Sequence, residues 1–351
     1  MHIKKTTIFA FLLVFTLMSL IIGCGGGAEQ PAASSGASEG GQAAAPQETA
    51  APEPEAIDFP TKDVTFIVPV SPGGGMDATA RLLVKYWEEH LGGKMIVENI
   101  TGAEYNNAIF AMLKAEADGH QVIMLPGVII NQLLDDSIPY DLNEFGWIGR
   151  VSSNRLITVA SNKSGLKTIE DIQKLGDTVA GVTGISSSQT VAQLLMAKEI
   201  GINVSPVTHK GTAESVLSTV RGDTDWTVAT EVTLVNHIQN GEVVPLFIGG
   251  GEERFPDLPD TPTLNELGYP EADSLMGFHR IVATNPETPE PVLKALRDSF
   301  EKAVNDPRFA EDLKKLNDKP DYLNGEDTAA LVKANIDLIA PEMEYIKSFK
   351  K

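Results

Sequence analysis

The strongest constraint on this sequence is the alternation of short apolar runs with amphipathic stretches after Pro60. The runs with strand character span 64–70, 95–98, 121–125, 178–182, 204–208, 224–229, 243–248 and 275–283. The helical patterns include 77–90, 106–115, 289–305, 307–317 and 326–348. Such alternation is typical of α/β folds. Because the chain after residue 57 is too long for one ordinary core, we expect two doubly wound α/β lobes.

The first residues carry the pattern of an export signal. Lys4 and Lys5 precede an apolar run over 8–22, which is too short and wrongly flanked for a membrane-spanning helix. The run ends at Gly23 and Cys24, as in a bacterial lipobox. We therefore expect a lipoprotein signal peptide over 1–23 and an extracytoplasmic protein anchored to the cell membrane through acyl chains on Cys24. The alternative is a buried or incidental thiol.

Residues 24–57 form the next segment, which is made mainly of Gly, Ala, Ser, Pro, Gln and Glu. Such a composition buries too little apolar surface to offset the entropy of ordering, so we expect a disordered tether. Cys24 is the only cysteine, and its lipidation leaves no thiol for a disulfide. The fold must then depend on its hydrophobic core.

The composition excludes several classes of function. A formal net charge of −20 disfavours binding to nucleic acid. The six histidines show no metal-ligand spacing, so we expect neither a metal nor a cofactor. Ser187 and Ser188 could approach His209, but the chain has no Gly-x-Ser-x-Gly elbow. We therefore expect a protein that is not an enzyme, with a secreted hydrolase as the alternative.

A glycine-rich loop joins the first strand to the first helix. Its residues are Pro72, Gly73, Gly74, Gly75, Met76 and Asp77. Glycines at the start of a helix let backbone N–H groups approach an anion, which the helix dipole also attracts. The spacing fits neither a P-loop nor a dinucleotide fingerprint. A plain tight turn is the alternative, and Asp77 is either a helix cap or a ligand group.

Several later loops follow strands in the same way, and strand ends of a parallel sheet converge on one crevice. The first of these loops contains Gly102, Ala103, Glu104, Tyr105 and Asn106. The others contain Gly127, Gly184, Ser186, Ser187, Ser188, His209, Lys210 and Thr230. We expect these residues to form the remaining walls of the ligand site, although helix capping alone would explain one or two of the serines.

The order of these motifs resembles the Bug-type receptors of tripartite tricarboxylate transporters. The matching segments are 60–69, 72–77, 80–81, 97–99, 117–120, 209–211, 258–263 and 267–270. The resemblance implies a type II periplasmic-binding-protein fold, in which a ligand cleft lies between two lobes. Residues 58–158 and 282–351 would form lobe 1, and 159–281 would form lobe 2. It also implies a monomer that binds a small carboxylate-type ligand and partners with membrane permease subunits.

Two departures from the family pattern concern the ligand. Glu104 and Tyr105 stand where the family has small residues, and His279 and Arg280 replace an aromatic pair. Arg280 could bind a second carboxylate or could sit in a surface salt bridge. Dicarboxylates, aromatic carboxylates and amino-bearing carboxylates all stay open as ligands. A sensor that presents its solute to a membrane kinase is a further alternative.

Overall fold

A computed structural model of the chain describes residues 57–350 except 128, 136, 186 and 317. The expected signal peptide, Cys24 and nearly all of the tether lie outside these residues, as does Ser186. No helix in the described part of the chain has both the length and the apolar character needed to cross a membrane.

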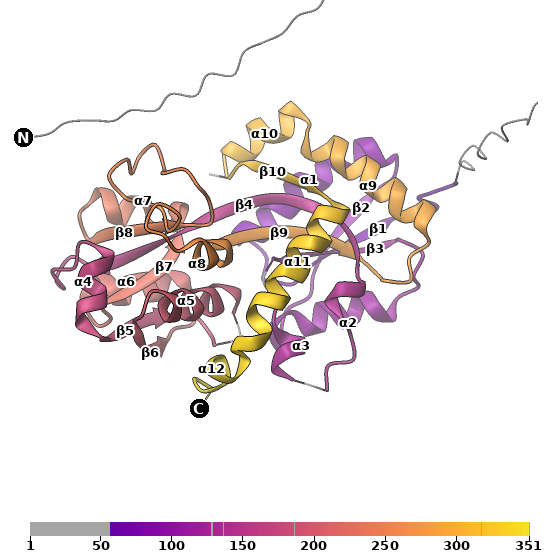
Figure 1. Cartoon of the computed structure of the whole chain (residues 1–351). Coiled ribbons are helices and arrows are strands. Elements are labelled where there is room, and N and C mark those ends of the chain that lie inside the picture. The colour runs from indigo at the N-terminus through magenta and orange to yellow at the C-terminus, as the bar shows by residue number, and fades with distance from the viewer. Residues whose placement is uncertain (1–56, 128, 136, 186, 317, 351) are drawn as a thin grey trace, which may run out of the picture. The chain divides into compact units, whose positions relative to one another are not determined.

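A ten-stranded sheet organises the described residues (Figure 1). Its order is β2-β1-β3-β9-β4-β7-β5-β6, and β8 and β10 each pair with β4. The strands are β1 Val64–Val68, β2 Met95–Asn99, β3 Gln121–Pro126, β4 Gly146–Ser161, β5 Asp177–Val182, β6 Asn203–Thr208, β7 Trp226–Thr230, β8 Val243–Gly249, β9 Gly277–Thr284 and β10 Pro320–Asn324.

The long strand β4 joins two halves of this sheet. Between Gly146 and Arg155 it pairs with β9, and part of this stretch also pairs with β10. From Leu156 to Ser161 it pairs with β7 and β8 instead. We call the strands β1–β3, β9 and β10 with the start of β4 the first half, and β5–β8 with the end of β4 the second half.

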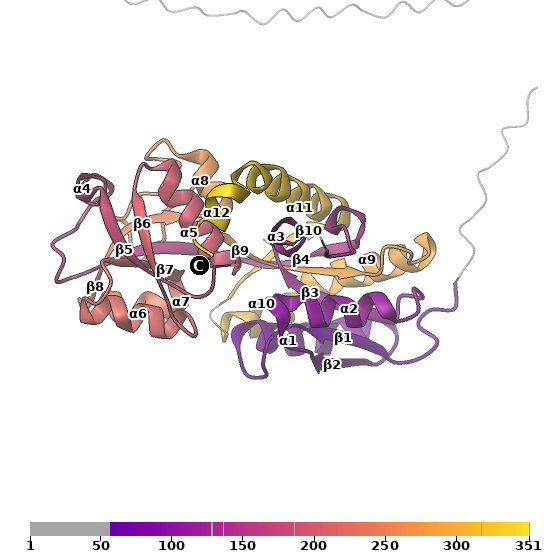
Figure 2. The ribbon, with the colours of Figure 1, turned by 90° about the horizontal axis from the view of Figure 1, so that it is seen from below.

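The helices gather around these halves in the same way in both views, with α1, α2, α9 and α10 on the first half and α4–α8 on the second (Figures 1 and 2). The helices are α1 Gly75–Leu91, α2 Asn106–Lys114, α3 Asn131–Leu134, α4 Ile169–Leu175, α5 Ser188–Glu199, α6 Thr212–Arg221, α7 Glu231–Gln239, α8 Pro270–Leu275, α9 Glu290–Val304, α10 Pro307–Lys314, α11 Gly325–Ile339 and α12 Met343–Lys347. Short 3-10 turns span Ala103–Tyr105, Leu142–Glu144 and Ala340–Glu342.

Local sequence signals explain several helix ends. Thr168 and Asp171 form a capping box at α4. Gly92 ends α1 with a left-handed φ of 78°, which glycine adopts without a steric cost. The N-cap of α5 is Ser187, whose hydroxyl accepts the amide of Thr190 at 3.2 Å.

Two predicted elements differ from the structure, and two observed strands were not predicted. The strand expected from residue 275 begins at Gly277, after the short helix α8. The helix expected over 326–348 breaks at Ala340, next to Pro341, because proline cannot donate the helical hydrogen bond. Two strands, β4 and β10, were not predicted: polar residues such as Asn154 interrupt the apolar pattern of β4, and β10 begins at a proline.

The C-terminal segment contacts both halves. Val332 and Ile336 of α11 belong to a core cluster with first-half residues such as Ile281. Farther along, Met343 and Ile346 pack into the cluster around α5 of the second half. The end of the chain therefore connects the two halves a second time, apart from β4.

Candidate functional site

A cavity of about 430 Å³ lies between the first and second halves. Its wall comes from loops at strand ends, from the starts of helices and from the segment after α10. The lining residues are Val70, Gly75, Met76, Tyr105, Asn154, Thr183, Ser187, Ser188, Gln189, Thr212, Thr230, Val232, Thr233, Phe278, Arg280, Leu316 and Asp318. The cleft expected between two lobes is present at this place.

The amino ends of four long helices meet at this cavity. They belong to α1 at Gly75, α5 at Ser188, α6 at Thr212 and α7, whose N-cap is Thr230. The first N–H groups of a helix have no partner inside the helix, and the positive end of its dipole lies there. The site therefore favours an anionic group without a row of basic side chains.

The first glycine loop contributes Gly75 and Met76 to the wall. Gly73, with a left-handed φ of 90°, donates its amide to Asp77 Oδ2 at 2.8 Å. Burial alone would raise the pKa of Asp77, but hydrogen bonds from Arg81, Gly73 and Asn99 outweigh it and hold the pKa below its usual value. Asp77 thus fastens the turn as a charged residue, and neither it nor Pro72, Gly73 or Gly74 lines the cavity.

The second glycine loop contributes only Tyr105 to the wall. Gly102, Ala103 and Glu104 are exposed residues outside it. Asn106 is engaged within the first half, where its Oδ1 accepts the Tyr140 hydroxyl at 2.6 Å and the Asn131 amide at 3.2 Å. The Tyr105 side chain therefore contributes to the cavity wall, whereas the charged side chain of Glu104 does not.

Arg280 of β9 lies in the cavity wall in an ion pair with Asp318, with Nη1 2.8 Å from Oδ2. Both side chains are buried, with exposed fractions of 9% and 4%, so the expectation of a surface salt bridge was wrong. Burial lowers the pKa of Arg280, and Asp318 opposes that shift. These two are the only charged side chains among the described lining residues.

The second half presents a wall rich in hydroxyl groups. Ser187 Oγ lies 2.7 Å from Thr183 Oγ1 and 2.9 Å from Thr190 Oγ1. Thr212 donates to Gln189 Oε1 at 3.2 Å, which ties α6 to α5 beside the cavity. This wall is polar but uncharged.

His209, Lys210 and Gly184 do not line the cavity. Lys210 is exposed, and its amide donates to Glu214 at 2.9 Å. Within the described residues, neither Ser187 nor Ser188 forms a hydrogen bond with His209.

Gly127 does not line the cavity and packs against His279 instead. A Cβ at Gly127 would come within 2.7 Å of the ring of His279, so glycine is needed here for close packing. Burial, with a further effect of Arg150, lowers the pKa of His279 to about 3. A neutral His279 ring thus fills the space next to Gly127.

Several lining residues were not predicted. They are Val70, Asn154, Gln189, Val232, Thr233, Phe278, Leu316 and Asp318, whereas Thr183 and Thr212 lie in loops that the sequence analysis placed at the site. Gln189 and Thr233 lie in the first turns of α5 and α7, so helix starts facing the crevice were an available signal. Asn154 lies on a strand that was not predicted, and Asp318 lies between helix α10 and strand β10.

A second cavity of about 230 Å³ adjoins the first and shares Asn154, Val232 and Asp318 with it. Arg155 crosses its wall with the guanidinium carbon 4.0 Å from the ring centre of Phe255. In the described part of the chain, no group of three or more His, Cys, Asp or Glu residues is arranged to hold a metal ion.

Residues 79–346 match the family described as tripartite tricarboxylate transporter family receptor. A UPF0065 protein in the tcbD-tcbE intergenic region of Pseudomonas sp. strain P51 is 25% identical over 272 residues, covering 74% of this chain and 79% of that protein. Periplasmic binding protein BugD has a TM-score of 0.66 and 24% identity, covering 82% of this chain and 99% of BugD. MatC from Rhodopseudomonas palustris, solved with bound malate, has a TM-score of 0.64 and 23% identity, and the match covers 82% of this chain and 100% of MatC.

The structural similarity to BugD confirms the predicted α/β periplasmic-binding-protein fold. The family match extends over most of the chain, and it agrees with the motifs that suggested a Bug-type receptor. This chain therefore belongs to the receptor family of the tripartite tricarboxylate transporters.

Proposed function

We propose that this chain is an extracytoplasmic, lipid-anchored receptor that binds a small carboxylate-bearing solute and delivers it to the permease subunits of a tripartite transporter. The observation that carries the proposal is the cavity, where four helix amino ends and one buried guanidinium face the same space. Membership of the receptor family supports the delivery step. Malate in MatC is a carboxylate bound on the same fold.

The charges of the site support an anionic solute. Arg280 and Asp318 together add no net charge, so the helix ends favour an anion at about 0.3–1 kcal/mol for each anion–helix interaction, in addition to any hydrogen bond that the Arg280 guanidinium donates. The acidic surface of the chain opposes an anion at a distance, but salt screens that field beyond about 8 Å at physiological ionic strength. Selectivity for anions therefore arises from groups in the wall.

We assign the contacts to the predicted residues that line the cavity: Gly75, Met76, Tyr105, Ser187, Ser188, Thr230 and Arg280. The other predicted site residues that the structure describes do not line the cavity. We keep the lobe bounds proposed from the sequence, 58–158 with 282–351 and 159–281. They differ from the two halves of the sheet at the start of β9, where residues 277–281 pair within the first half. Closure of the lobes is a hinge motion about β4 and β9, and it encloses the solute between them.

Thermal unfolding in the presence of single solutes tests the binding function. The panel contains acetate, benzoate, succinate, malate, adipate, citrate and aspartate. A ligand at one hundred times its dissociation constant adds about 2.7 kcal/mol to the free energy of unfolding. Because the unfolding entropy is about 2.1 cal/mol/K per residue, we expect the Tm of a folded region of this length to rise by about 4 °C for at least one carboxylate. A folded protein that no member of the panel stabilises would contradict the proposal.

Detergent phase partitioning of the protein made in bacterial cells tests the lipid anchor. The wild-type chain is expected in the detergent phase, because acyl chains add about 0.8 kcal/mol per buried methylene. Cys24→Ser is expected in the aqueous phase. Equal partitioning of the two proteins would contradict lipidation at Cys24 while leaving solute binding open to its own test.

A further inference from the structure

Only part of the Arg280 guanidinium group has partners. Nη1 donates to Ser152 Oγ at 3.1 Å and to Asn154 Oδ1 at 2.5 Å, and it lies 2.8 Å from Asp318 Oδ2 in the ion pair. Arg280 as a whole is only 7% exposed, and its Nε is buried and has no acceptor among the described residues. A buried donor without an acceptor is unfavourable, and a bound acceptor removes that penalty.

The unused edge of this guanidinium lies next to the start of α1. A Cβ built on Gly75 would lie 3.6 Å from Nη2 of Arg280. Gly75 and Met76 are the first residues of α1, so their amides have no acceptor inside the helix. Nη2 therefore lies beside the first residue of α1 in the cavity wall, and Nε lies on the same edge of the guanidinium group.

We propose that the Nε–Nη2 edge of Arg280 and the first amides of α1 bind one carboxylate group together, and that Asp318 is the residue that positions Arg280. The inference rests on the proposed function and specifies which groups recognise the solute. A carboxylate accepts two parallel hydrogen bonds from a guanidinium edge and still has lone pairs for backbone amides. Arg280 thus reinforces the carboxylate site at α1, in place of the separate second carboxylate site expected from the sequence.

Asp318 has the contacts of a positioning residue. Oδ2 accepts the Ser152 hydroxyl at 3.1 Å and forms the ion pair with Arg280. Oδ1 accepts the Asn154 amide at 3.0 Å and the Lys319 backbone amide at 2.8 Å. Three hydrogen bonds and one ion pair therefore engage both oxygens of this carboxylate. Asp318 therefore fixes Nη1 and has no free acceptor for a cationic group of the solute.

These contacts narrow the class of solute. The described lining contains no other acidic side chain that could pair with an ammonium group. The opposite wall offers hydroxyls and the amino ends of α5, α6 and α7, which suit oxygen acceptors. The solute is therefore a carboxylate without an amino group, and its remaining part carries hydroxyl or carboxylate oxygens.

Isothermal titration with Arg280→Gln tests the shared carboxylate site. The probes are the panel carboxylate that raises Tm most and the amide of that carboxylate. Loss of a charge-assisted hydrogen-bond pair is expected to weaken carboxylate binding about 10- to 100-fold, with a smaller effect on the amide. Arg150→Gln is the matched control, because Arg150 pairs with Asp321 at 2.7 Å and does not line the cavity.

Asp318→Asn tests the positioning role. The variant leaves the buried Arg280 charge uncompensated, so the Tm of the ligand-free protein is expected to fall. The ligand-induced rise in Tm is expected to grow, because the bound carboxylate then supplies the missing negative charge. A merely structural role would lower Tm in both states and leave the rise unchanged. Asp321→Asn is the control for loss of an Arg–Asp pair elsewhere.

Three outcomes would overturn the inference. They are an unchanged carboxylate-to-amide affinity ratio in folded Arg280→Gln, an unchanged or smaller ligand-induced rise in Asp318→Asn, and tighter binding of aspartate than of succinate and malate. Failure of the wild-type protein to bind any panel member is a different result, because it contradicts the proposed function itself.

Discussion

At position 75, helix α1 begins with a residue that has no side chain. The φ angle of Gly75 lies outside the left-handed region, so the backbone does not require glycine there. Access to the Arg280 guanidinium provides a reason for it, because a Cβ would lie 3.6 Å from Nη2. At this position, solute binding favours glycine, whereas the stability of the folded chain would favour alanine.

Gly75→Ala is expected to separate these two requirements. An alanine restricts the unfolded chain and should raise the free energy of unfolding by about 0.4–1 kcal/mol. Its methyl group covers the free guanidinium edge, so carboxylate affinity should fall at least about tenfold, equivalent to 1.4 kcal/mol. Denaturant unfolding and titration measure the two effects. Gly74→Ala is the control, since its Cβ would meet nothing closer than 3.9 Å; equal binding by both variants would contradict the account.

The loop before α2 holds three consecutive non-glycine residues in left-handed conformations. The φ angles of Ala103, Glu104 and Tyr105 are 45°, 52° and 79°. Side chains in this region cost energy because Cβ approaches the following carbonyl oxygen. The loop therefore holds the Tyr105 side chain in the cavity wall at a cost in stability.

Ala103→Gly is expected to relieve part of this cost. Ala103 is exposed and does not line the cavity, so the change should raise the free energy of unfolding by about 0.5–1 kcal/mol without altering affinity. Ala111→Gly, within helix α2, should instead lower it by about 1 kcal/mol. Denaturant unfolding distinguishes the two, and destabilisation by Ala103→Gly would contradict the expected relief.

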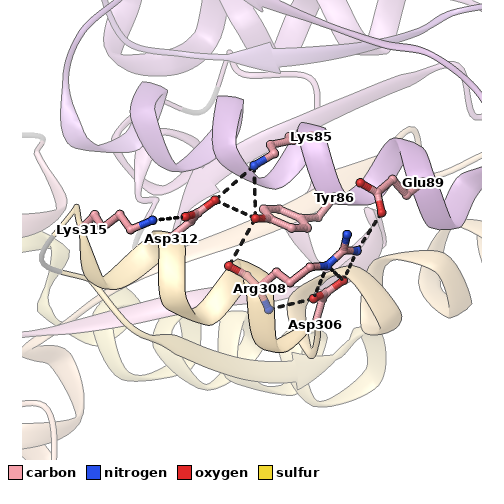
Figure 3. Close-up of polar contacts among 7 residues, drawn as sticks. All are labelled: Lys85, Tyr86, Glu89, Asp306, Arg308, Asp312 and Lys315. Atoms are coloured by element: carbon pink, nitrogen blue, oxygen red, sulfur yellow. Dashed lines mark hydrogen bonds and ion pairs between the residues drawn. The ribbon is translucent and has the colours of Figure 1, made fainter.

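At the scale of elements, helices α1 and α10 are joined by a polar cluster drawn in Figure 3. The Tyr86 hydroxyl lies 2.7 Å from Asp312 Oδ2, which also accepts Lys85 at 3.1 Å. Arg308 bridges Asp306 at 2.6 Å and Glu89 at 2.7 Å. Since α1 begins at the cavity and the segment after α10 carries Asp318, this cluster fixes two parts of the site relative to each other.

The cluster makes stability depend on pH. Hydrogen bonds from Lys315, Tyr86 and Lys85 hold the pKa of Asp312 well below its usual value, and Arg308 lowers the pKa of Asp306 to about 2. Carboxyl groups with depressed folded-state pKa values stabilise the protein above the unfolded pKa of about 4, and this contribution is lost as the pH falls from about 4 toward 2.

Asp312→Asn is expected to reduce the slope of Tm against pH between about pH 4 and 2, because its carboxyl group no longer titrates. Thermal unfolding across that range provides the measurement. Asp298→Asn is the control, because the Asp298 carboxylate is exposed and contacts only Lys294 among the described residues. An identical slope in wild type and Asp312→Asn would show that Asp312 does not contribute to acid unfolding.

The sequence predicted most elements because their apolar patterns are regular. The run at Val64–Val68 is buried on both sides, and α1 ends at a glycine as expected. β4 was missed because Ser152, Ser153 and Asn154 interrupt its apolar pattern, while tertiary packing buries two of them. Packing against neighbouring strands, and not the local sequence preference, makes this segment a strand.

The site was predicted in part for the same reason. Loops at strand ends were recognisable from glycines and hydroxyls, which placed Gly75, Ser187 and Thr230 in the wall. Which loop residue turns inward depends on backbone angles, so the sequence could not distinguish Tyr105 from Glu104. The partner of Arg280 also escaped prediction, because Asp318 is brought to it by a contact across 38 positions of the chain.

At the scale of the whole described molecule, closure should change the distance between opposite sides of the cavity. Val232 of the second half and Leu316 after α10 both line it, with exposed fractions of 42% and 39%. Apolar side chains exposed at facing walls gain stability when closure removes them from water. We therefore expect the two side chains to approach each other when the solute binds.

Cross-linking tests this closure. The variant carries Val232→Cys and Leu316→Cys together with Cys24→Ser, which removes the only native cysteine. Solute is expected to increase the rate at which a short bismaleimide joins the two thiols. A pair at Val207 and Leu217, two exposed residues of the second half, is the control for thiol reactivity. An equal rate with and without solute would exclude closure at this wall.

The switch of partners along β4 occurs between Arg155, opposite Gly277, and Leu156, opposite Thr230. Asn154, one residue before it, bonds through its side chain to both Arg280 and Asp318. Any bending of the strand therefore takes place beside the groups that contact the solute. Binding of the solute is therefore expected to change the backbone at this point. The amide chemical shifts of residues 154–156 in a nuclear magnetic resonance spectrum should then report whether the cavity is occupied, without a label on the ligand.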